Sequence, residues 1–314
     1  MNKKKIILKV NNLSVTFNNK NEKICALSDF SCSLYSGECT AIIGESGCGK
    51  SVAAHAILKL FPKNTDISGS VCFDAQELIT LSEHVLQKIR GKKIGIIYQN
   101  PDRSLNPIYQ IGRQMKEPLD VHNVCNPSDK WNHIINILRK VGFLDPDQTL
   151  ERYPCHCSGG MNQRAATAVV LGLMPDIVIA DEPTKGLDYD RVADVESSLQ
   201  EVKREGHSLL LITHDITLAE RIADELIVMY AGQVIEKGPM KKVLSTPLHP
   251  YTEGLIKSLP RNGFIPIDGY APPLSNLPSG CRFAERCTSA SEICIFQNPD
   301  LKIKNGHEVR CHQY

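Results

Sequence analysis

Five short runs of consecutive, mostly apolar residues restrict the fold more than any other feature of this sequence. They are CTAIIG (39–44), KIGIIYQ (93–99), DIVIAD (176–181), SLLLITH (208–214) and ELIVMY (225–230). Unbroken apolar strands are typical of sheets that are covered on both faces, whereas half-exposed strands alternate. Because helical patterns separate the runs, they predict an α/β fold whose core sheet is mainly parallel.

The flanking segments predict three further parts. Residues 1–40 alternate more and carry turn signals such as NNKN and SGE, which favours an antiparallel β layer. Residues from about 107 to 172 are mostly helical in pattern and form an insertion between two strands. After residue 245 the chain becomes rich in Pro and Gly, which indicates a linker. We therefore predict an α/β domain at 1–245, including a helical subdomain at about 107–172, and a small appendage at 246–314.

Composition and charge favour a cytoplasmic protein without a nucleic-acid partner. The net charge is +1, so no overall electrostatic attraction to nucleic acid or anionic lipid is expected. No apolar run is long enough to cross a bilayer, and MNKKKIILKV lacks the apolar region and cleavage site of a signal peptide. Without an export signal, the twelve cysteines are expected to be thiols or metal ligands rather than disulfides.

A phosphate-binding loop is predicted by GESGCGKS (44–51), which matches the pattern G-x-x-x-x-G-K-[ST]. It lies between a predicted strand and a helical pattern, as this motif requires. The glycines let backbone N–H groups surround phosphates, while Lys50 would reach the β- and γ-phosphates and Ser51 would bind Mg²⁺. The residues expected to contact the nucleotide are Gly44, Glu45, Ser46, Gly47, Cys48, Gly49, Lys50 and Ser51.

Two acidic residues at a strand end complete the predicted nucleotide site. The run DIVIADEP (176–183) is an apolar strand that ends in Asp181 and Glu182. A carboxylate at Asp181 would lie near the Mg²⁺ shell, and Glu182 could polarise the attacking water as a general base. Downstream of a phosphate-binding loop, this interpretation is favoured over an ordinary buried strand with acidic residues at its end.

Gln99 and His214 also end predicted strands. Ligands bind at the carboxyl ends of strands in α/β sheets, so both side chains could reach a γ-phosphate or its attacking water. Taken separately, each residue is more often only a polar residue that ends a strand. The expected Mg²⁺ ligands are Ser51, Gln99 and Asp181.

A second glycine-rich turn, CSGGMNQR (157–164), leads into a helical pattern. Such a turn at a helix start is an anion site. One nucleotide does not need two such sites, unless the second one faces a nucleotide bound to another molecule.

Together these motifs resemble the ATP-binding subunit of ABC transporters over about residues 5–240, in the order typical of that family. GESGCGKS resembles Walker A, IVIADE resembles Walker B with Glu182 as the catalytic residue, Gln99 resembles the Q-loop glutamine, and His214 resembles the switch histidine. The resemblance implies a P-loop NTPase fold of the ABC type, with a mainly parallel core sheet, an antiparallel β layer and a helical subdomain.

The segment CSGGM resembles the LSGGQ signature, with Cys157 in place of Leu and Met161 in place of Gln. The resemblance implies a head-to-tail dimer in which the signature contacts ATP bound to the partner. The residues involved would be Ser158, Gly159, Gly160 and Met161. Asp188 of GLD would be the D-loop residue. Phe17 of the first β layer would stack on adenine, and a core-packing role for Phe17 is the alternative that remains open.

Three segments resemble the oligopeptide/dipeptide/nickel importer subfamily, and in particular its longer, first ATPase. They are YQNPDRSLNP, SGGMNQR and TPLHPYTEGLIKSLP. The resemblance implies an importer of peptides or of nickel and other metal chelates, at the cytoplasmic face of the membrane. Its partners would be a second, distinct ATPase subunit, two membrane permeases and an extracytoplasmic binding protein.

Two alternative functions belong to other classes of protein. A soluble ABC ATPase of DNA repair or translation would carry a long coiled-coil insertion or a second cassette, and neither is present. A regulatory, iron-sensing subunit would not need the intact Glu182 and His214.

The last four cysteines have the spacing C-x5-C-x6-C-x16-C, beginning in CRFAERCTSASEIC (281–294). Structural zinc sites usually have tighter pairs, whereas ligation of a [4Fe–4S] cluster by cysteines tolerates varied spacing. Free packing thiols are the alternative that remains open. The subfamily resemblance implies that this pattern can hold a [4Fe–4S] cluster through Cys281, Cys287, Cys294 and Cys311.

Overall fold

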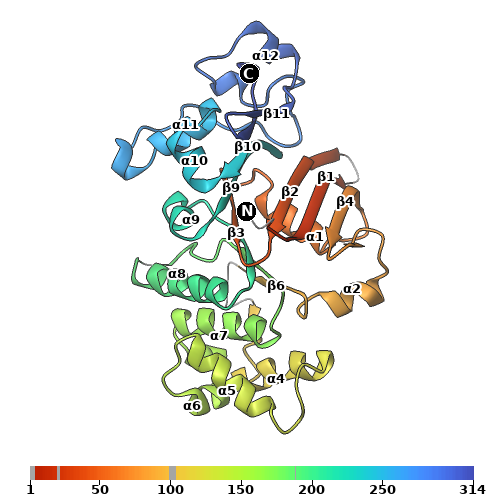
Figure 1. Cartoon of the computed structure of the whole chain (residues 1–314), viewed down its shortest axis with the longest axis vertical. Helices are drawn as coiled ribbons and strands as arrows, with labels where there is room; N and C mark the ends of the chain where they lie inside the picture. The colour runs from red at the N-terminus through yellow and green to blue at the C-terminus, as the bar shows by residue number, and fades with distance from the viewer. Residues whose placement is uncertain (1–3, 20–21, 99–103, 188) are drawn as a thin grey trace. The chain divides into compact units, whose positions relative to one another are not determined.

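The computed structural model describes residues 4–19, 22–98, 104–187 and 189–314 (Figure 1). Two compact units share the chain, and each is described on its own. Unit 1 is built from Met1–Lys4, Tyr35–Cys39 and Leu81–Ile212. Unit 2 is built from Lys5–Leu34, Thr40–Thr80 and Thr213–Tyr314.

Unit 1 contains three parallel strands in the order β8, β7, β6. They are β6 (Ile94–Ile97), β7 (Ile177–Asp181) and β8 (Ser208–Ile212). Every residue of β7 and β8 is buried, as the unbroken apolar runs predict. In the register, Asp181 lies opposite Ile212, so both strands end at the same edge.

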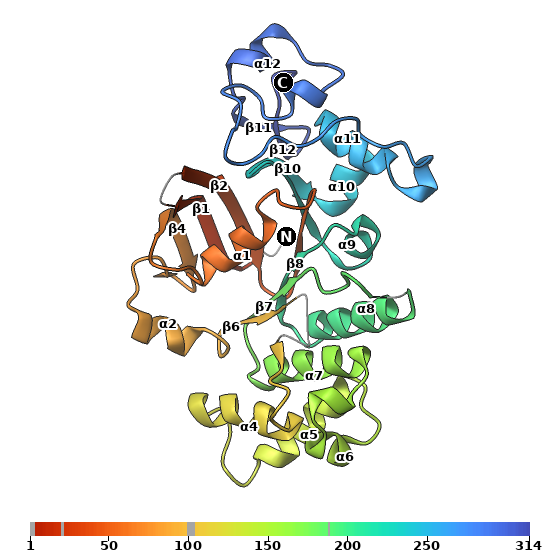
Figure 2. The same cartoon turned by 180° about the vertical axis from the view of Figure 1, so that it is seen from behind.

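Most of the remaining described residues of unit 1 are in helices, as predicted for the insertion. The helices are α2 (Glu83–Ile89), α4 (Ile111–His122), α5 (Lys130–Lys140), α6 (Pro146–Glu151), α7 (Gly159–Gly172) and α8 (Tyr189–Arg204). Helices α4 to α7 pack against one another, which Figure 2 shows in yellow and green. Their contacts bury apolar residues such as Leu119, Ile134 and Leu138.

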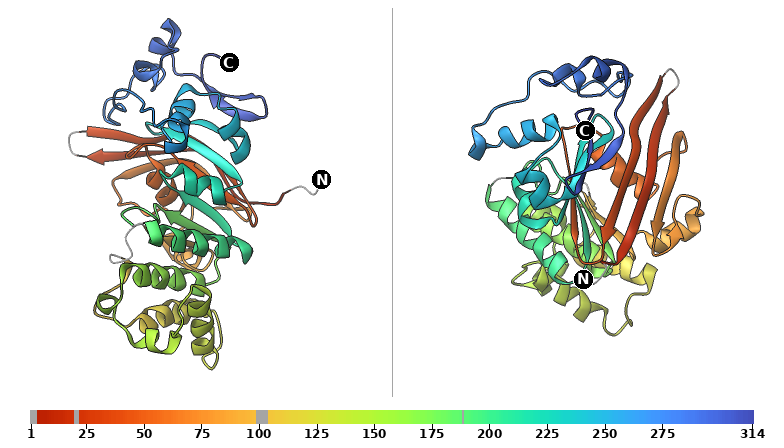
Figure 3. Two further views of the ribbon diagram at one scale, coloured as in Figure 1. Left: turned by 90° about the vertical axis from the view of Figure 1, so that its left-hand side faces the viewer. Right: turned by 45° about the horizontal axis from the view of Figure 1, so that its top comes forward.

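Unit 2 begins with a four-stranded sheet in the order β2, β1, β4, β5. The strands are β1 (Ile6–Asn19), β2 (Glu22–Tyr35), β4 (Thr65–Phe73) and β5 (Gln76–Glu77). β1 and β4 are antiparallel, which confirms the predicted β layer (Figure 3, red to orange). Helix α1 (Lys50–Ile57) packs against β1.

A second sheet of unit 2 follows the order β11, β12, β10, β9, β3. Its strands are β3 (Cys39–Ile43), β9 (Glu225–Tyr230), β10 (Gln233–Pro239), β11 (Leu301–Lys304) and β12 (His307–Arg310). β3 and β9 are parallel, and the remaining pairs are antiparallel. The domain division at residue 245 stays a prediction. Strand β12 follows residue 245 in the chain and is hydrogen-bonded to β10, which precedes it.

A buried carboxylate joins several elements of unit 2. Glu236 in β10 is fully buried, and its two oxygens accept the N–H groups of Leu248 (2.8 Å) and His249 (2.9 Å). His307 Nε2 of β12 lies 3.0 Å from the same carboxylate. These contacts place the start of α11 (Pro250–Lys257) against β10 and β12. The other helices of unit 2 are α9 (Ile216–Ile222), α10 (Met240–Ser245) and α12 (Glu292–Phe296).

His249 caps helix α11 as a neutral base. Its Nδ1 accepts the N–H of Tyr251 at 3.0 Å, and the residue is buried. Burial lowers the pKa of His249 from 6.5 to about 3, because the interior does not solvate the imidazolium.

Acid is therefore expected to destabilise unit 2 through His249. The folded-state pKa lies below the unfolded value, so the unfolded chain binds the proton first and stability falls as pH drops below 6.5. Between pH 7 and pH 5 the loss from this group is about 2 kcal/mol. Urea denaturation at both pH values measures it. The variant His249→Asn should lose this part of the pH dependence, whereas the exposed His84→Asn should keep it, and equal pH dependence in the two variants would contradict the assignment.

Candidate nucleotide-binding site

The predicted phosphate-binding loop connects β3 to α1 within unit 2. Lys50 is the first residue of α1 and is only 5% exposed. Its Nζ donates to the carbonyl oxygens of Gly44 (2.8 Å) and Glu45 (3.0 Å), so the ammonium group lies inside the curve of the loop. A cation enclosed by a loop at a helix N-terminus fits a phosphate group.

Gly49 illustrates why this loop needs glycine. It caps α1 in the left-handed region with φ of 97°, and a Cβ there would lie 2.6 Å from the Ala26 carbonyl oxygen. Gly47 also has a positive φ of 80°, but a Cβ there would meet nothing within 4 Å. Backbone conformation thus requires glycine at both positions, and close packing requires it only at Gly49.

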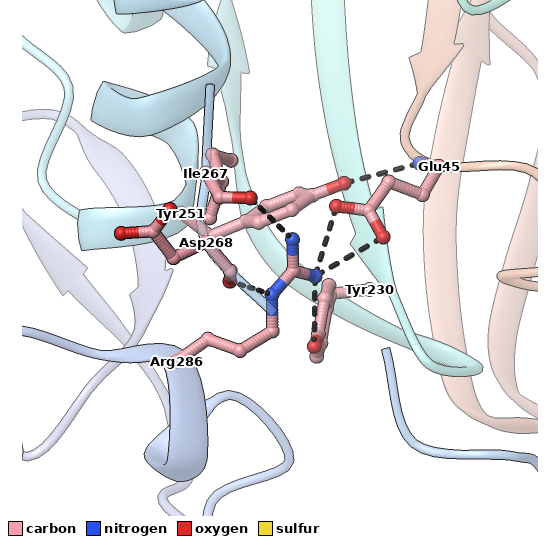
Figure 4. Close-up of polar contacts among 6 residues, drawn as sticks. All are labelled: Glu45, Tyr230, Tyr251, Ile267, Asp268 and Arg286. Carbon is pink, nitrogen blue, oxygen red and sulfur yellow. Dashed lines mark hydrogen bonds and ion pairs between the residues drawn. The ribbon is translucent and has the colours of Figure 1, made fainter. Parts of the chain in front are cut away.

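The loop is also held from outside by residues far along the chain (Figure 4). The N–H of Glu45 donates to Tyr251 Oη at 3.0 Å, and Arg286 Nη1 lies 2.9 Å and 3.1 Å from the two Glu45 carboxylate oxygens. Neither Tyr251 nor Arg286 was recognised as part of the site from the sequence. The segment TPLHPYTEGLIKSLP, which contains Tyr251, is specific to the importer subfamily, but its sequence does not indicate a role in ATP chemistry.

Two further predicted residues belong to unit 2. His214 is exposed and follows Thr213, whose N–H donates to the Ile42 carbonyl at 3.1 Å. His214 therefore lies near the end of β3, which leads into the loop. Phe17 is half-buried in β1 and packs edge-to-face on Phe61, with ring centroids 5.4 Å apart.

Asp181 and Glu182 lie in unit 1, at the end of β7, and each is 7% exposed. Glu182 adopts a left-handed conformation with φ of 49°, and its N–H donates to the Ile212 carbonyl at 2.8 Å. A non-glycine residue in this region costs about 1–2 kcal/mol, and such strain concentrates at functional sites. The strain sets Glu182 apart from an ordinary residue at a strand end.

The SGG turn forms the start of α7 in unit 1. Ser158 is exposed, and its Oγ accepts the N–H of Met161 at 3.3 Å as the helix N-cap. Gly159 and Gly160 form the first turn, so backbone N–H groups without helical partners face outward there. Burial raises the pKa of the half-buried Cys157, so this thiol is neutral beside the turn.

Two predicted residues, Gln99 and Asp188, lie outside the described residues.

The four C-terminal cysteines line one cavity of about 180 Å³ in unit 2, together with His249 and His312. The four are Cys281, Cys287, Cys294 and Cys311, and all are free thiols. Burial, followed by the negative charge of neighbouring cysteines, raises the pKa of Cys281. In the part of the chain that the structure describes, no three His, Cys, Asp or Glu side chains are arranged to hold one metal ion.

Two family models match the chain. The model for the ABC transporter matches residues 27–185, and the model for the oligopeptide/dipeptide transporter C-terminal region matches residues 235–294. The chain belongs to the ABC transporter family, as an ATP-binding subunit of its oligopeptide/dipeptide branch. As in this family, it hydrolyses ATP to drive transport. No helix among the described residues has the length and apolar character needed to cross a membrane.

Similar proteins agree with this assignment. A "putative peptide import ATP-binding protein" of Brucella melitensis biotype 1 is 38% identical over 312 residues, covering 97% of this chain and 94% of the relative. A protein of the same description from Brucella ovis is 37% identical over 325 residues, which cover 97% of this chain and 96% of the relative.

Two solved structures share the fold. A dimeric ATP-binding cassette in a post-hydrolysis state, bound to ADP and Pi, is 26% identical with a TM-score of 0.65, covering 74% of this chain and 98% of that one. The protein cbiO1 from Clostridium perfringens, part of the ABC transporter complex cbiONQ, is 30% identical with a TM-score of 0.64. The match covers 76% of this chain and 91% of that one. The predicted fold class is thereby confirmed.

The two loop glycines give a matched test of this geometry. Gly47→Ala should cost about 1–2 kcal/mol of unfolding free energy, from backbone strain alone. Gly49→Ala should cost about 1–3 kcal/mol more, because its methyl group would also collide with the Ala26 carbonyl. Chemical denaturation of both variants measures the difference. Equal losses would show that the close approach of Ala26 does not constrain the loop.

Proposed function

We propose that this ATPase powers the import of peptides across the cell membrane. The observation that carries the proposal is the match of residues 235–294 to the oligopeptide/dipeptide transporter C-terminal region. The descriptions of the Brucella relatives, which name peptide import, support it. The sequence alone leaves two classes of transported substrate, namely peptides and chelates of nickel or other metals. The descriptions of the relatives favour peptides.

In this proposal ATP binds with its phosphates against the loop of unit 2. Lys50 already lies inside the curve of the loop and would bind the β- and γ-phosphates. Ser51, Asp181 and Gln99 would hold Mg²⁺, which neutralises charge on the phosphates when it is bound. Phe17 would stack on adenine.

Hydrolysis requires a base and a group that senses the γ-phosphate. We assign the base to Glu182, which would accept a proton from the attacking water, and the second role to His214. The low exposure of Glu182 and its strained backbone support the assignment, because strained backbone conformations concentrate at functional sites.

The signature would act on a second subunit. Ser158, Gly159, Gly160 and Met161 would bind the γ-phosphate of ATP on a partner ATPase, with Asp188 at the same interface. The exposure of Ser158 and the position of the SGG turn at the N-terminus of α7 support this arrangement. The assembly would contain a second, distinct ATPase subunit and two permeases at the cytoplasmic face, and an extracytoplasmic protein would deliver the peptide.

The importer is testable in proteoliposomes that contain this chain with its partner ATPase and permeases. ATP inside the vesicles should drive uptake of a short peptide in the presence of the binding protein. Glu182→Gln should lower phosphate release by about 10²–10⁴-fold, while ATP binding persists. The exposed Glu83→Gln is the control, and it should transport normally.

Three results would contradict these assignments. Uptake of nickel chelates without peptide would contradict the substrate class. ATPase activity stimulated by DNA or ribosomes, without copurifying permeases, would contradict import itself. Unaltered turnover in Glu182→Gln would contradict the catalytic assignment.

We also propose that the four-cysteine cavity holds a [4Fe–4S] cluster. The donor set fits, because four cysteines line one cavity, and a cluster binds each cysteine through a different iron atom rather than around one ion. A cluster bound there would cross-link the appendage and give it a redox-active group.

Anaerobically purified protein should contain about four iron atoms and four sulfides per chain. Cys287→Ser should lower both contents, whereas the exposed Cys155→Ser should not. Because burial raises the pKa of Cys281, Cys287 and Cys311, cluster assembly must displace thiol protons, and reconstitution should weaken as pH falls. Iron-free protein under these conditions, or equal iron in the two variants, would refute the cluster.

A further inference from the structure

Arg286 makes an unusually complete set of contacts around the phosphate-binding loop. Its Nη1 donates to both carboxylate oxygens of Glu45 and to Tyr230 Oη at 3.2 Å. Its Nε donates to the Asp268 carbonyl at 2.8 Å, and its Nη2 lies 3.4 Å from the Ile267 carbonyl. Figure 4 shows the guanidinium group enclosed by these partners. Hydrogen bonds on several sides thus hold the planar guanidinium group next to Glu45.

The Arg286–Glu45 pair lies in a partly dry environment. The Arg286 side chain is only 7% exposed, and the Glu45 side chain is 31% exposed. Burial alone would lower the pKa of Arg286, but the hydrogen bonds that it donates to Tyr230 and Glu45 outweigh burial and raise the pKa. The guanidinium stays charged, and its attraction to Glu45 is less screened than that of a surface pair.

The loop backbone is tied to the same region. The Glu45 N–H donates to Tyr251 Oη, whose ring packs 4.7 Å from the ring of Tyr230. At the other end of the loop, the Cys48 carbonyl accepts the N–H of Gly232, and Arg282 donates to the neighbouring Ala231 carbonyl. Both ends of the loop therefore connect to the segment that carries the cysteines.

We propose that Arg286 is a positioning residue for ATP binding, which holds the phosphate-binding loop in its binding conformation through the Glu45 carboxylate. The loop recognises phosphates mainly through backbone N–H groups, which bind well only when they point to one centre. Glu45 is the second residue of the loop, so fixing its side chain and its N–H restricts the path of the following residues. Arg286 itself need not touch ATP.

This role predicts a specific kinetic pattern. The loop holds the phosphates in the ground state and in the transition state, so loosening it weakens both equally. Arg286→Gln should raise the dissociation constant and the KM for MgATP about tenfold, as expected for the loss of a hydrogen-bonded charge pair. The value of kcat at saturating ATP should change by less than about twofold.

The test uses the full chain with MgATP as the probe, by calorimetry for binding and by phosphate release for turnover with its partner subunits. Arg286→Lys keeps the charge but lacks the fork, and it should give an intermediate dissociation constant. Tyr251→Phe keeps the ring and removes the acceptor of the Glu45 N–H, so it should also weaken binding. Arg261→Gln breaks a surface pair with Glu220 and serves as the control with unchanged binding.

A double-mutant cycle separates positioning through Glu45 from a general loss of stability. In the Glu45→Gln background, Arg286→Gln should change the dissociation constant by less than about twofold, because the link is already broken. Wild-type affinity in a folded Arg286→Gln protein would overturn the proposal, and so would full additivity in the cycle. If Arg286→Gln does not fold, wild-type affinity in both Arg286→Lys and Tyr251→Phe overturns it equally. ATP binding by the chain does not depend on the transported substrate, so failure here is distinct from failure of peptide import.

Discussion

The fully buried carboxylate of Glu236 is the interaction on which the arrangement of unit 2 depends. A buried carboxylate without partners would be very costly, so the chain must bring donors to it. It does so with the N–H groups of Leu248 and His249, and the buried Nε2 of His307 lies 3.0 Å from the same carboxylate. One side chain in β10 thereby fixes where helix α11 starts and where β12 lies. The residues His249, Pro250 and Tyr251 that begin α11 therefore have a structural role here rather than a chemical one.

That fixed segment gives the phosphate-binding loop its outer support. Helix α11 carries Tyr251, whose hydroxyl meets the Glu45 N–H, and the following linker carries the carbonyl groups that hold Arg286. A loop rich in glycine has high conformational freedom, so its binding shape requires contacts from neighbouring elements. In this chain those contacts come from a segment that a minimal nucleotide-binding domain would not need.

Much of the fold could be predicted because its signals are local. The unbroken apolar runs became β3, β6, β7, β8 and β9, and GESGCGKS became the loop between β3 and α1. The strain at Glu182 could not be predicted, because it depends on the hydrogen bond to Ile212 in the next strand. The Arg286–Glu45 pair joins residues 241 positions apart, and neither residue has a local pattern that identifies its partner. The predicted roles of Gln99 and Asp188 concern residues outside the described structure.

The pairing of β10 with β12 has a consequence for biosynthesis. β10 has β9 on one side and β12 on the other, and the chain makes β12 only after the linker and the cysteine-bearing segment. At about 5–20 residues per second, β10 waits for its second neighbour for seconds with its N–H and C=O groups unpaired. An unpaired edge strand can pair with other chains. A chain whose synthesis ends before β12 would therefore keep β10 as an unpaired edge that is prone to aggregation.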